Sequence, residues 1–195
     1  MDDIGSSDQV QMVWPERFLH SPPSYTIPAG YELRTYQEGD EARFFEIMER
    51  AGWQDWNREK LKPWLYRILP GGWLMMITEK EKEIVASAMA THDHTWIQPF
   101  CGEVGWTVTD PDHSGKGLGT ALVSAVTERF LDAGYRTIHL YTEPWRLAAL
   151  KLYLKVGYVP LIEDAAASEN WREICAQLGF PFTPGDWPSM VECGE

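Results

Sequence analysis

The stretch from Val104 to Gly134, VGWTVTDPDHSGKGLGTALVSAVTERFLDAG, constrains the fold of this chain more than any other. An alternating apolar run leads into a glycine-rich turn, and the turn opens a long amphipathic helix. Glycines let the backbone approach an anion closely, and the free N–H groups of a helix's first turn point outward. Lys116 adds a cation beside Gly115, Gly117 and Gly119. The arrangement predicts a phosphate site between a strand and a helix.

The spacing within this turn argues against two common phosphate-binding motifs. No Gly-Lys-Ser/Thr follows the glycines, and the glycines read GxGxG rather than GxGxxG. A nucleoside triphosphatase with a P-loop and a dehydrogenase of the Rossmann type are therefore disfavoured.

Two motifs resemble those of the GNAT superfamily of N-acetyltransferases. The family's turn signature, Arg/Gln-x-x-Gly-x-Gly/Ala, corresponds here to residues 114–119, SGKGLG, in which Ser114 replaces the usual Arg or Gln. Downstream the family commonly has Asn-x-x-Ala-x-x-x-Tyr-x-x-x-Gly-Phe. The matching positions in this chain are Arg146, Ala149, Tyr153, Gly157 and Tyr158. The resemblance covers residues 103–162 and implies the family's fold and its acyl-CoA chemistry.

The resemblance implies that acetyl-CoA is the co-substrate. No metal is expected, because no complete set of ligands at recognisable spacing is present. In the family, one strand pairs through its backbone with the pantetheine amides and leads the diphosphate to the glycine turn. In this sequence the strand is 106–109, the turn is 114–120, and Arg146 stands at the family's Asn position. The expected cofactor-binding residues are Trp106, Thr107, Val108, Thr109, Ser114, Gly115, Lys116, Gly117, Leu118, Gly119, Thr120 and Arg146.

Tyr153 is the proton donor that the resemblance implies, because the matching tyrosine in family members often protonates the CoA sulfur. A phenol has a pKa near about 10 and a thiol near about 8.5, so the transfer needs no severe tuning. The alternative is that Tyr153 is an ordinary half-buried aromatic residue.

Glu103 is the candidate general base. It precedes Ser114 by eleven positions, the offset at which histone-acetylating relatives carry their base. A primary ammonium has a pKa near about 10.4, so a carboxylate, directly or through water, must help to remove its proton. The alternative is a solvated glutamate at the start of a strand, since many family members use another residue or only a water chain.

Direct transfer from acetyl-CoA to the amine is favoured over an acetyl-enzyme. The cysteines, Cys101, Cys175 and Cys193, are widely spaced, form no CxxC, and none aligns with a nucleophile. The same spacing indicates neither a zinc site nor a disulfide framework. It is typical of a reducing compartment.

The order of elements predicts an α/β fold with a mixed, mostly antiparallel central sheet flanked by helices on both faces, the GNAT-like acyl-CoA N-acyltransferase fold. The predicted strands cover 31–36, 73–78, 84–91, 103–109, 137–142 and 158–162. The predicted helices run from Asp40 to before Gly52 and over 56–69, 118–133, 144–156 and 168–178. Gly134 and Gly157 are the expected helix stops.

The chain is divided into three parts on composition. Residues 1–28, rich in Ser, Pro and Asp, are predicted to be a flexible lead that either stays free or docks in part. Residues 29–163 are predicted to be the N-acetyltransferase domain. Residues 164–195 are a helical and aromatic extension outside the shared core.

The formal net charge of −12 argues against nucleic-acid binding, which needs clustered Lys and Arg. It suits a cationic acceptor, or it merely keeps the protein soluble. The N-terminus has no basic segment before an apolar core, and no apolar run approaches the length of a membrane span, so we expect a cytoplasmic protein without membrane contact.

The aromatic and histidine content leaves two local alternatives open. Trp53, Trp56, Trp64 and Trp73 fall in the region that forms the acceptor side of the family's cleft, where they would hold a cationic or aromatic amine or simply fill the core. The segment 92–94, HDH, places two imidazoles on one side of an extended chain. Because a third ligand is missing, a loop or substrate-cleft role is favoured over metal binding.

Three functions remain open at this point. The leading hypothesis is an N-acetyltransferase that acts on an amine of a small molecule or peptide through a ternary complex. The second is a sensor or interaction module that binds acyl-CoA without catalysis, which the departures at Ser114 and Arg146 keep open. The third is an interaction protein whose aromatic-rich ends form a homodimer surface.

Overall fold

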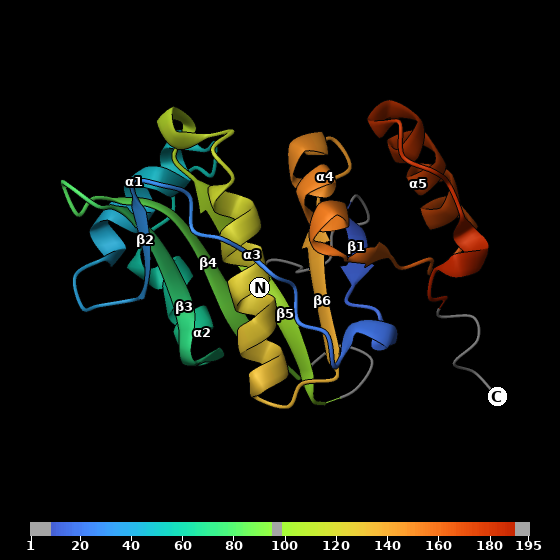
Figure 1. The fold of residues 1–195 in the computed structure, drawn as a ribbon, viewed down its shortest axis with the longest axis horizontal. Coiled ribbons are helices and arrows are strands. Elements are labelled where there is room, and N and C mark those ends of the chain that lie inside the picture. The colour runs from blue at the N-terminus through green and yellow to red at the C-terminus, as the bar shows by residue number, and fades with distance from the viewer. Residues whose placement is uncertain (1–8, 95–98, 190–195) are drawn as a thin grey trace.

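The computed structural model describes residues 9–94 and 99–189, and within them seven strands form one open sheet (Figure 1). The spatial order is β2-β3-β4-β5-β6-β1-β7. The strands are β1 (Val10–Val13), β2 (Tyr31–Thr35), β3 (Ile68–Thr78), β4 (Ile84–Asp93), β5 (Cys101–Thr109), β6 (Thr137–Thr142) and β7 (Val159–Pro160). Only β5 and β6 run parallel, and the other neighbours are antiparallel. The predicted mixed, mostly antiparallel sheet is confirmed.

Helices cover both faces of this sheet, as predicted. They are α1 (Glu41–Arg50), α2 (Arg58–Leu65), α3 (Leu118–Asp132), α4 (Leu147–Val156) and α5 (Ala165–Leu178). In Figure 1, α3 and α4 lie in front of the sheet, α1 and α2 lie behind it, and α5 stands beyond α4. Two apolar clusters follow from this arrangement, one beneath α3, α4 and α5 and one beneath α1 and α2. No α-helix in the described part of the chain is long and apolar enough to span a membrane.

The long helix α3 forms where the glycine turn ends. Gly117 caps its N-terminus with φ +84°, a conformation that other residues rarely adopt. Leu122, Val126 and Phe130 recur at helical spacing and are completely buried against the sheet. Gly134, with φ +83°, follows the C-cap residue as expected from its sequence position.

The structure differs from the predicted flexible lead over residues 1–28. Val10–Val13 forms β1 inside the sheet, where it pairs with β6 on one side and β7 on the other. The alternation of polar and apolar residues over 9–12 is a short signal of a strand, and in the structure Gln11 is buried together with Val10, Met12 and Val13. The chain then crosses the outer face of α3, where Tyr25 Oη donates to Glu128 Oε2 at 3.2 Å (Figure 1). Residues 1–8 lie outside the described residues.

The C-terminal extension packs onto the same body. Its helix α5 buries Trp171, Ile174 and Cys175 and includes the predicted helix 168–178. Beyond the helix, Trp187 lies edge-on to Trp171 with ring centroids 6.3 Å apart. The extension therefore contributes to the core beneath α4, and residues 190–195 lie outside the described residues.

Other boundaries shift by a few residues. The segment 70–72, predicted to end a helix, lies inside β3 beside an irregularity in its pairing with β4. The predicted strand 158–162 is reduced to Val159–Pro160.

Candidate active site

The central feature of the site is a gap between the two parallel strands. β5 and β6 pair only where Cys101–Glu103 faces Thr137–His139, and no pairing continues beyond Glu103. On its other side, β5 shifts register against β4 between Ser87 and Met89. Trp106 lies in the bulge that this shift creates, and its φ is +48°. The bulge and the splayed strands open the sheet at one point.

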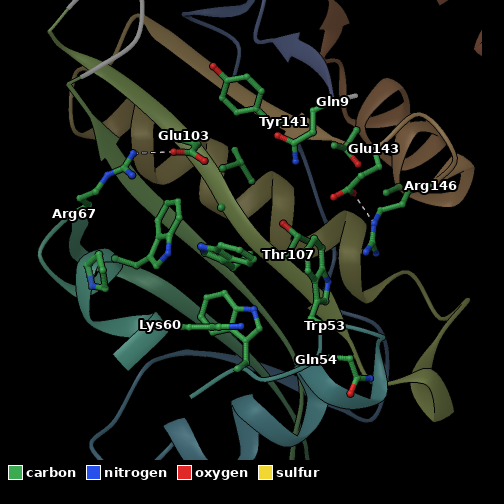
Figure 2. A pocket seen from close by; sticks show the side chains of 18 of the residues that line it. Gln9, Trp53, Gln54, Lys60, Arg67, Glu103, Thr107, Tyr141, Glu143 and Arg146 are labelled. Carbon is green, nitrogen blue, oxygen red and sulfur yellow. Dashed lines mark hydrogen bonds and ion pairs between the residues drawn. The ribbon is translucent and has the colours of Figure 1, made fainter. Parts of the chain in front are cut away.

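A cavity of about 820 Å³ lies at this opening (Figure 2). Its walls are β5 from Glu103 to Thr107, the end of β6 with the following loop, the segment from Trp53 into α2, and Tyr153 on α4. Both candidate catalytic residues therefore line one cavity, together with Trp106, Thr107 and Arg146 of the predicted cofactor residues.

The glycine turn lies outside this cavity, at the N-terminus of α3. Gly115 and Gly117 have φ values of +74° and +84°, and residues 114–117 are exposed. Lys116 Nζ donates to the carbonyl oxygen of Asp112 at 3.2 Å. The exposed turn leaves its backbone accessible to an anion, which is the geometry that a phosphate requires.

The remaining residues of the predicted cofactor set have different surroundings. Gly119 faces α4, and a Cβ there would lie 2.6 Å from Leu152 Cδ1, so this glycine allows α3 and α4 to approach closely. Val108 and Leu118 are buried in the two apolar clusters. Thr109 and Thr120 are half-buried.

A cluster of ion pairs, which the sequence did not predict, fixes the segment just before the glycine turn. Asp110, only 1% exposed, accepts from Arg43 Nη2 at 2.8 Å and lies 3.1 Å from Arg50 Nη2. Tyr31 Oη lies 2.8 Å from Nδ1 of His113. Helix α1 and strand β2 thus fix the segment that leads into the glycine turn.

Tyr153 lies on the buried side of α4 and is 7% exposed, so it is not half-buried as the alternative held. Burial raises the pKa of its phenol to about 12, against the opposing effects of the Thr107 hydroxyl and the Arg146 guanidinium. The hydroxyl therefore keeps its proton throughout the neutral range, and it is a weaker acid than the free phenol assumed from the sequence.

Glu103 is part of a buried polar network rather than a solvated residue. Its Oε2 accepts from Arg67 Nη2 at 2.8 Å, and the same nitrogen lies 3.5 Å from Asp93 Oδ1. His139 Nε2 lies 3.2 Å from Asp93 Oδ2. Burial raises the pKa of the Glu103 carboxyl, and Arg67 opposes this shift. Proximity of Arg67 could not be read from the sequence, where the two residues are far apart.

Three of the four predicted tryptophans form a wall of the cavity around Trp106. The rings of Trp53, Trp56 and Trp64 meet the Trp106 ring edge to face, with centroids 5.5, 4.2 and 5.1 Å away. Trp73 is instead 3% exposed and stacks on Tyr36 in the core, because it lies on a central strand beneath α1.

Two arginines lie against this wall. The Arg67 guanidinium lies 4.7 Å from the centroid of Trp64, and that of Arg146 lies 4.2 Å from the centroid of Trp53. Arg146, at the N-cap of α4, also pairs through Nε with Glu143 Oε2 at 2.6 Å. Figure 2 shows the Arg67–Glu103 and Arg146–Glu143 pairs at opposite ends of the cavity.

Two residues of the HDH segment, His92 and Asp93, contact other side chains of the protein. Asp93 faces Arg67 and His139, while His92 Nδ1 lies 2.8 Å from Tyr135 Oη. Within residues 9–94 and 99–189, no three His, Cys, Asp or Glu side chains are grouped so as to hold a metal ion.

Comparisons with known proteins place the chain in a family. Residues 33–158 match the profile of the Acetyltransferase (GNAT) family. Mycothiol acetyltransferase of Kocuria rhizophila is 27% identical over 150 residues, which is 70% of this chain and 48% of that protein. The same enzyme of Mycolicibacterium paratuberculosis is 27% identical over 188 residues, covering 84% of this chain and 57% of that protein. The chain spans about half the length of these relatives.

Solved structures share the fold. A GCN5-related N-acetyltransferase from Sphaerobacter thermophilus superposes with a TM-score of 0.57 and 23% identity, over 78% of this chain and 48% of that one. The ribosomal-protein-S18-alanine N-acetyltransferase of Escherichia coli does so with a TM-score of 0.53 and 18% identity, over 65% of this chain and 76% of that one. The chain belongs to the acetyltransferase (GNAT) family.

Proposed function

We propose that this member of the GNAT family is an N-acetyltransferase that transfers an acetyl group from acetyl-CoA to an amine by direct attack in a ternary complex. The observation that carries the proposal is the opening between β5 and β6, where Tyr153 and Glu103 line the same cavity. Amine acetylation needs one group that accepts a proton and one that donates a proton. Glu103 and Tyr153 would fill these two roles at one cavity.

The exposed turn and the bulged strand would hold the co-substrate. Backbone N–H groups of residues 115–119 and Lys116 would receive the diphosphate, and the free backbone at Trp106 and Thr107 would pair with the pantetheine amides. Bound acetyl-CoA supplies the electrophilic thioester. The bulge supports this role because it leaves backbone groups at the cavity without strand partners.

Glu103 would accept the proton of the attacking amine. Arg67 would be a positioning residue, since it donates to the Glu103 carboxylate at 2.8 Å and opposes the rise that burial causes in the pKa of this carboxyl. Tyr153 would carry the proton for the departing sulfur at its phenolic oxygen. Because burial raises the pKa of Tyr153 to about 12, the phenol donates a hydrogen bond early and yields its proton only as negative charge builds up.

Direct attack is favoured by the positions of the cysteines. Cys101 and Cys175 are almost completely buried, and neither lines the cavity. Cys193 lies outside the described residues. A covalent acetyl-enzyme would need a nucleophile at the cavity, and the described cysteines offer none there.

A small-molecule amine is the proposed acceptor class. The relatives with the printed name mycothiol acetyltransferase support a small acceptor, and a cavity of about 820 Å³ has the size of such sites. A peptide amine is the alternative, consistent with the fold shared with the S18-alanine enzyme.

The test is to incubate the purified protein with acetyl-CoA and a panel of amino acids, amino sugars, polyamines and peptides, and to follow the release of free thiol. Calorimetry measures acetyl-CoA binding in parallel. Thiol release with one amine class supports transfer. Binding without release across the panel favours an acyl-CoA sensor, and no binding overturns the proposed phosphate site.

A further inference from the structure

The cavity is charge-balanced although the chain carries a net charge of −12. The carboxylates and the cations that line it are equal in number: Glu59, Glu103 and Glu143 against Lys60, Arg67 and Arg146. The excess negative charge of the protein therefore lies elsewhere. A polycationic acceptor, which the composition suited, would gain no net attraction inside this cavity.

Two of the indole rings already have a guanidinium group of the protein stacked on their faces. Arg67 lies over Trp64 and Arg146 over Trp53, and each guanidinium is paired with a carboxylate. A substrate ammonium would have to displace an arginine to gain a cation–π contact on either ring. The tryptophan wall thus offers an apolar surface and edges, not an empty cage for a cation.

Lys60 is the cavity cation that lacks such a partner. No ion pair or hydrogen bond joins its Nζ to a carboxylate within the described part of the chain, and Figure 2 shows its side chain at the cavity. It lies in the first turn of α2, where the helix dipole disfavours a cation. Its neighbour Glu59 occupies the same turn, and there the dipole stabilises a carboxylate. Lys60 is exposed, so water surrounds its ammonium in the open cavity, and an anionic ligand would replace that water.

We infer that the acceptor carries an anionic group, such as a carboxylate, at the end opposite its reactive amine, with an apolar body between the two. This inference rests on the proposed function, because it places the amine at Glu103. Glu103 on β5 and Lys60 on α2 both line the cavity and lie apart from each other in Figure 2. The anion would pair with Lys60 while the apolar body covers the indole rings.

Three probes that differ only at the far end of one skeleton test the inference: 4-(aminomethyl)benzoate, benzylamine and 1,4-bis(aminomethyl)benzene. Thiol release gives kcat/KM with acetyl-CoA, and calorimetry in the presence of CoA gives the affinity of each probe. We expect the carboxylate probe to exceed benzylamine by about threefold in affinity, which corresponds to about 0.7 kcal/mol and is typical of an exposed ion pair, and the diamine to bind most weakly. Equal affinities, the reverse order, or no binding of any probe would overturn the inference.

Charge reversal at Lys60 assigns the effect to that residue. Lys60→Glu should abolish the preference for the carboxylate probe and make the diamine the better ligand. Lys62→Glu is the matched control, since Lys62 is exposed on the same helix but does not line the cavity, and it should leave the order unchanged. The same change of order in both variants would refute the role of Lys60. If the probes bind in the expected order but no thiol is released, the proposed acetyl transfer is rejected and the inference about the acceptor's anionic group stands.

Discussion

The glycine turn and the tryptophan wall are built in opposite ways. In the turn, backbone conformation at Gly115 and Gly117 creates the site, and the neighbouring side chains are exposed. In the wall, side chains from β5, α2 and the α1–α2 connection meet over the opening between β5 and β6. The first site is contiguous in sequence, and the second is assembled from segments that are far apart.

This difference predicts that the two proposed sites respond differently to substitution. A backbone site tolerates many side chains, as the serine at position 114 illustrates, but it tolerates few changes of conformation. A side-chain site changes with each substitution, so the acceptor must be inferred from local charges and contacts.

The largest expected loss of activity is for a change at Glu103, which lies in the proposed acceptor site. Glu103→Gln removes the proposed base while it keeps the shape of the side chain, and should lower kcat/KM by about 10²- to 10⁴-fold with acetyl-CoA affinity little changed. Steady-state thiol release and calorimetry measure the two quantities. An unchanged kcat/KM would remove Glu103 from the mechanism and point to a water chain.

Tyr153→Phe tests the proposed proton donor for the departing CoA sulfur. Loss of the phenolic proton should lower turnover by about ten- to a thousand-fold, while acetyl-CoA binding stays within a few-fold of the original. If turnover is unaltered, Tyr153 is only a buried aromatic residue. A parallel loss of acetyl-CoA affinity would assign it to donor binding instead.

Arg67→Gln tests the positioning of Glu103 through a pH profile. The base works only when ionised, so activity falls as the pH drops through the pKa of Glu103, which burial raises. Arg67 opposes that rise, so its removal should shift the acid limb of kcat/KM to higher pH. Arg136→Gln, an exposed change distant from the cavity, is the control and should leave the limb in place. A limb that stays fixed in Arg67→Gln would contradict the positioning role.

Gly117→Ala tests the backbone character of the donor site. A Cβ at φ +84° should cost about 1–2 kcal/mol of the free energy of unfolding and weaken acetyl-CoA binding, because the turn must hold a strained conformation. Denaturant unfolding and calorimetry measure both. Gly185→Ala, where open space surrounds the added methyl group, should change neither. If Gly117→Ala also changes neither, the turn is not the anion site.

The smallest effect is expected where a side chain is added to the backbone site. Ser114→Arg restores the residue usual in the family at an exposed position and should tighten acetyl-CoA binding by no more than about 1 kcal/mol. The gain should disappear at high salt, because exposed charges are screened. A gain that persists at high salt would indicate a buried contact and would weaken the contrast between the two sites.

Local patterns predicted the elements whose signals are contiguous. Residues 137–142 form β6 as expected, and Gly134 and Gly157 follow their helices with positive φ. The glycine turn and the helix after it were predictable for the same reason, since glycine spacing and helical periodicity act over neighbouring residues. The resemblance to GNAT enzymes added the expectation that Tyr153 and Glu103 belong to one site, and the structure places both at one cavity.

Tertiary structure alone decided which distant residues meet. Val10–Val13 is too short for its own pattern to fix a strand, and it forms β1 by pairing with β6 on one side and β7 on the other. Arg67 reaches Glu103, and Arg43 reaches Asp110, only because the strands and α1 bring them together. The sequence by itself determined the positive φ values of the glycine turn and of the helix stops, which depend on local sterics. The charges and rings around the cavity depend on long-range packing, which no local pattern records.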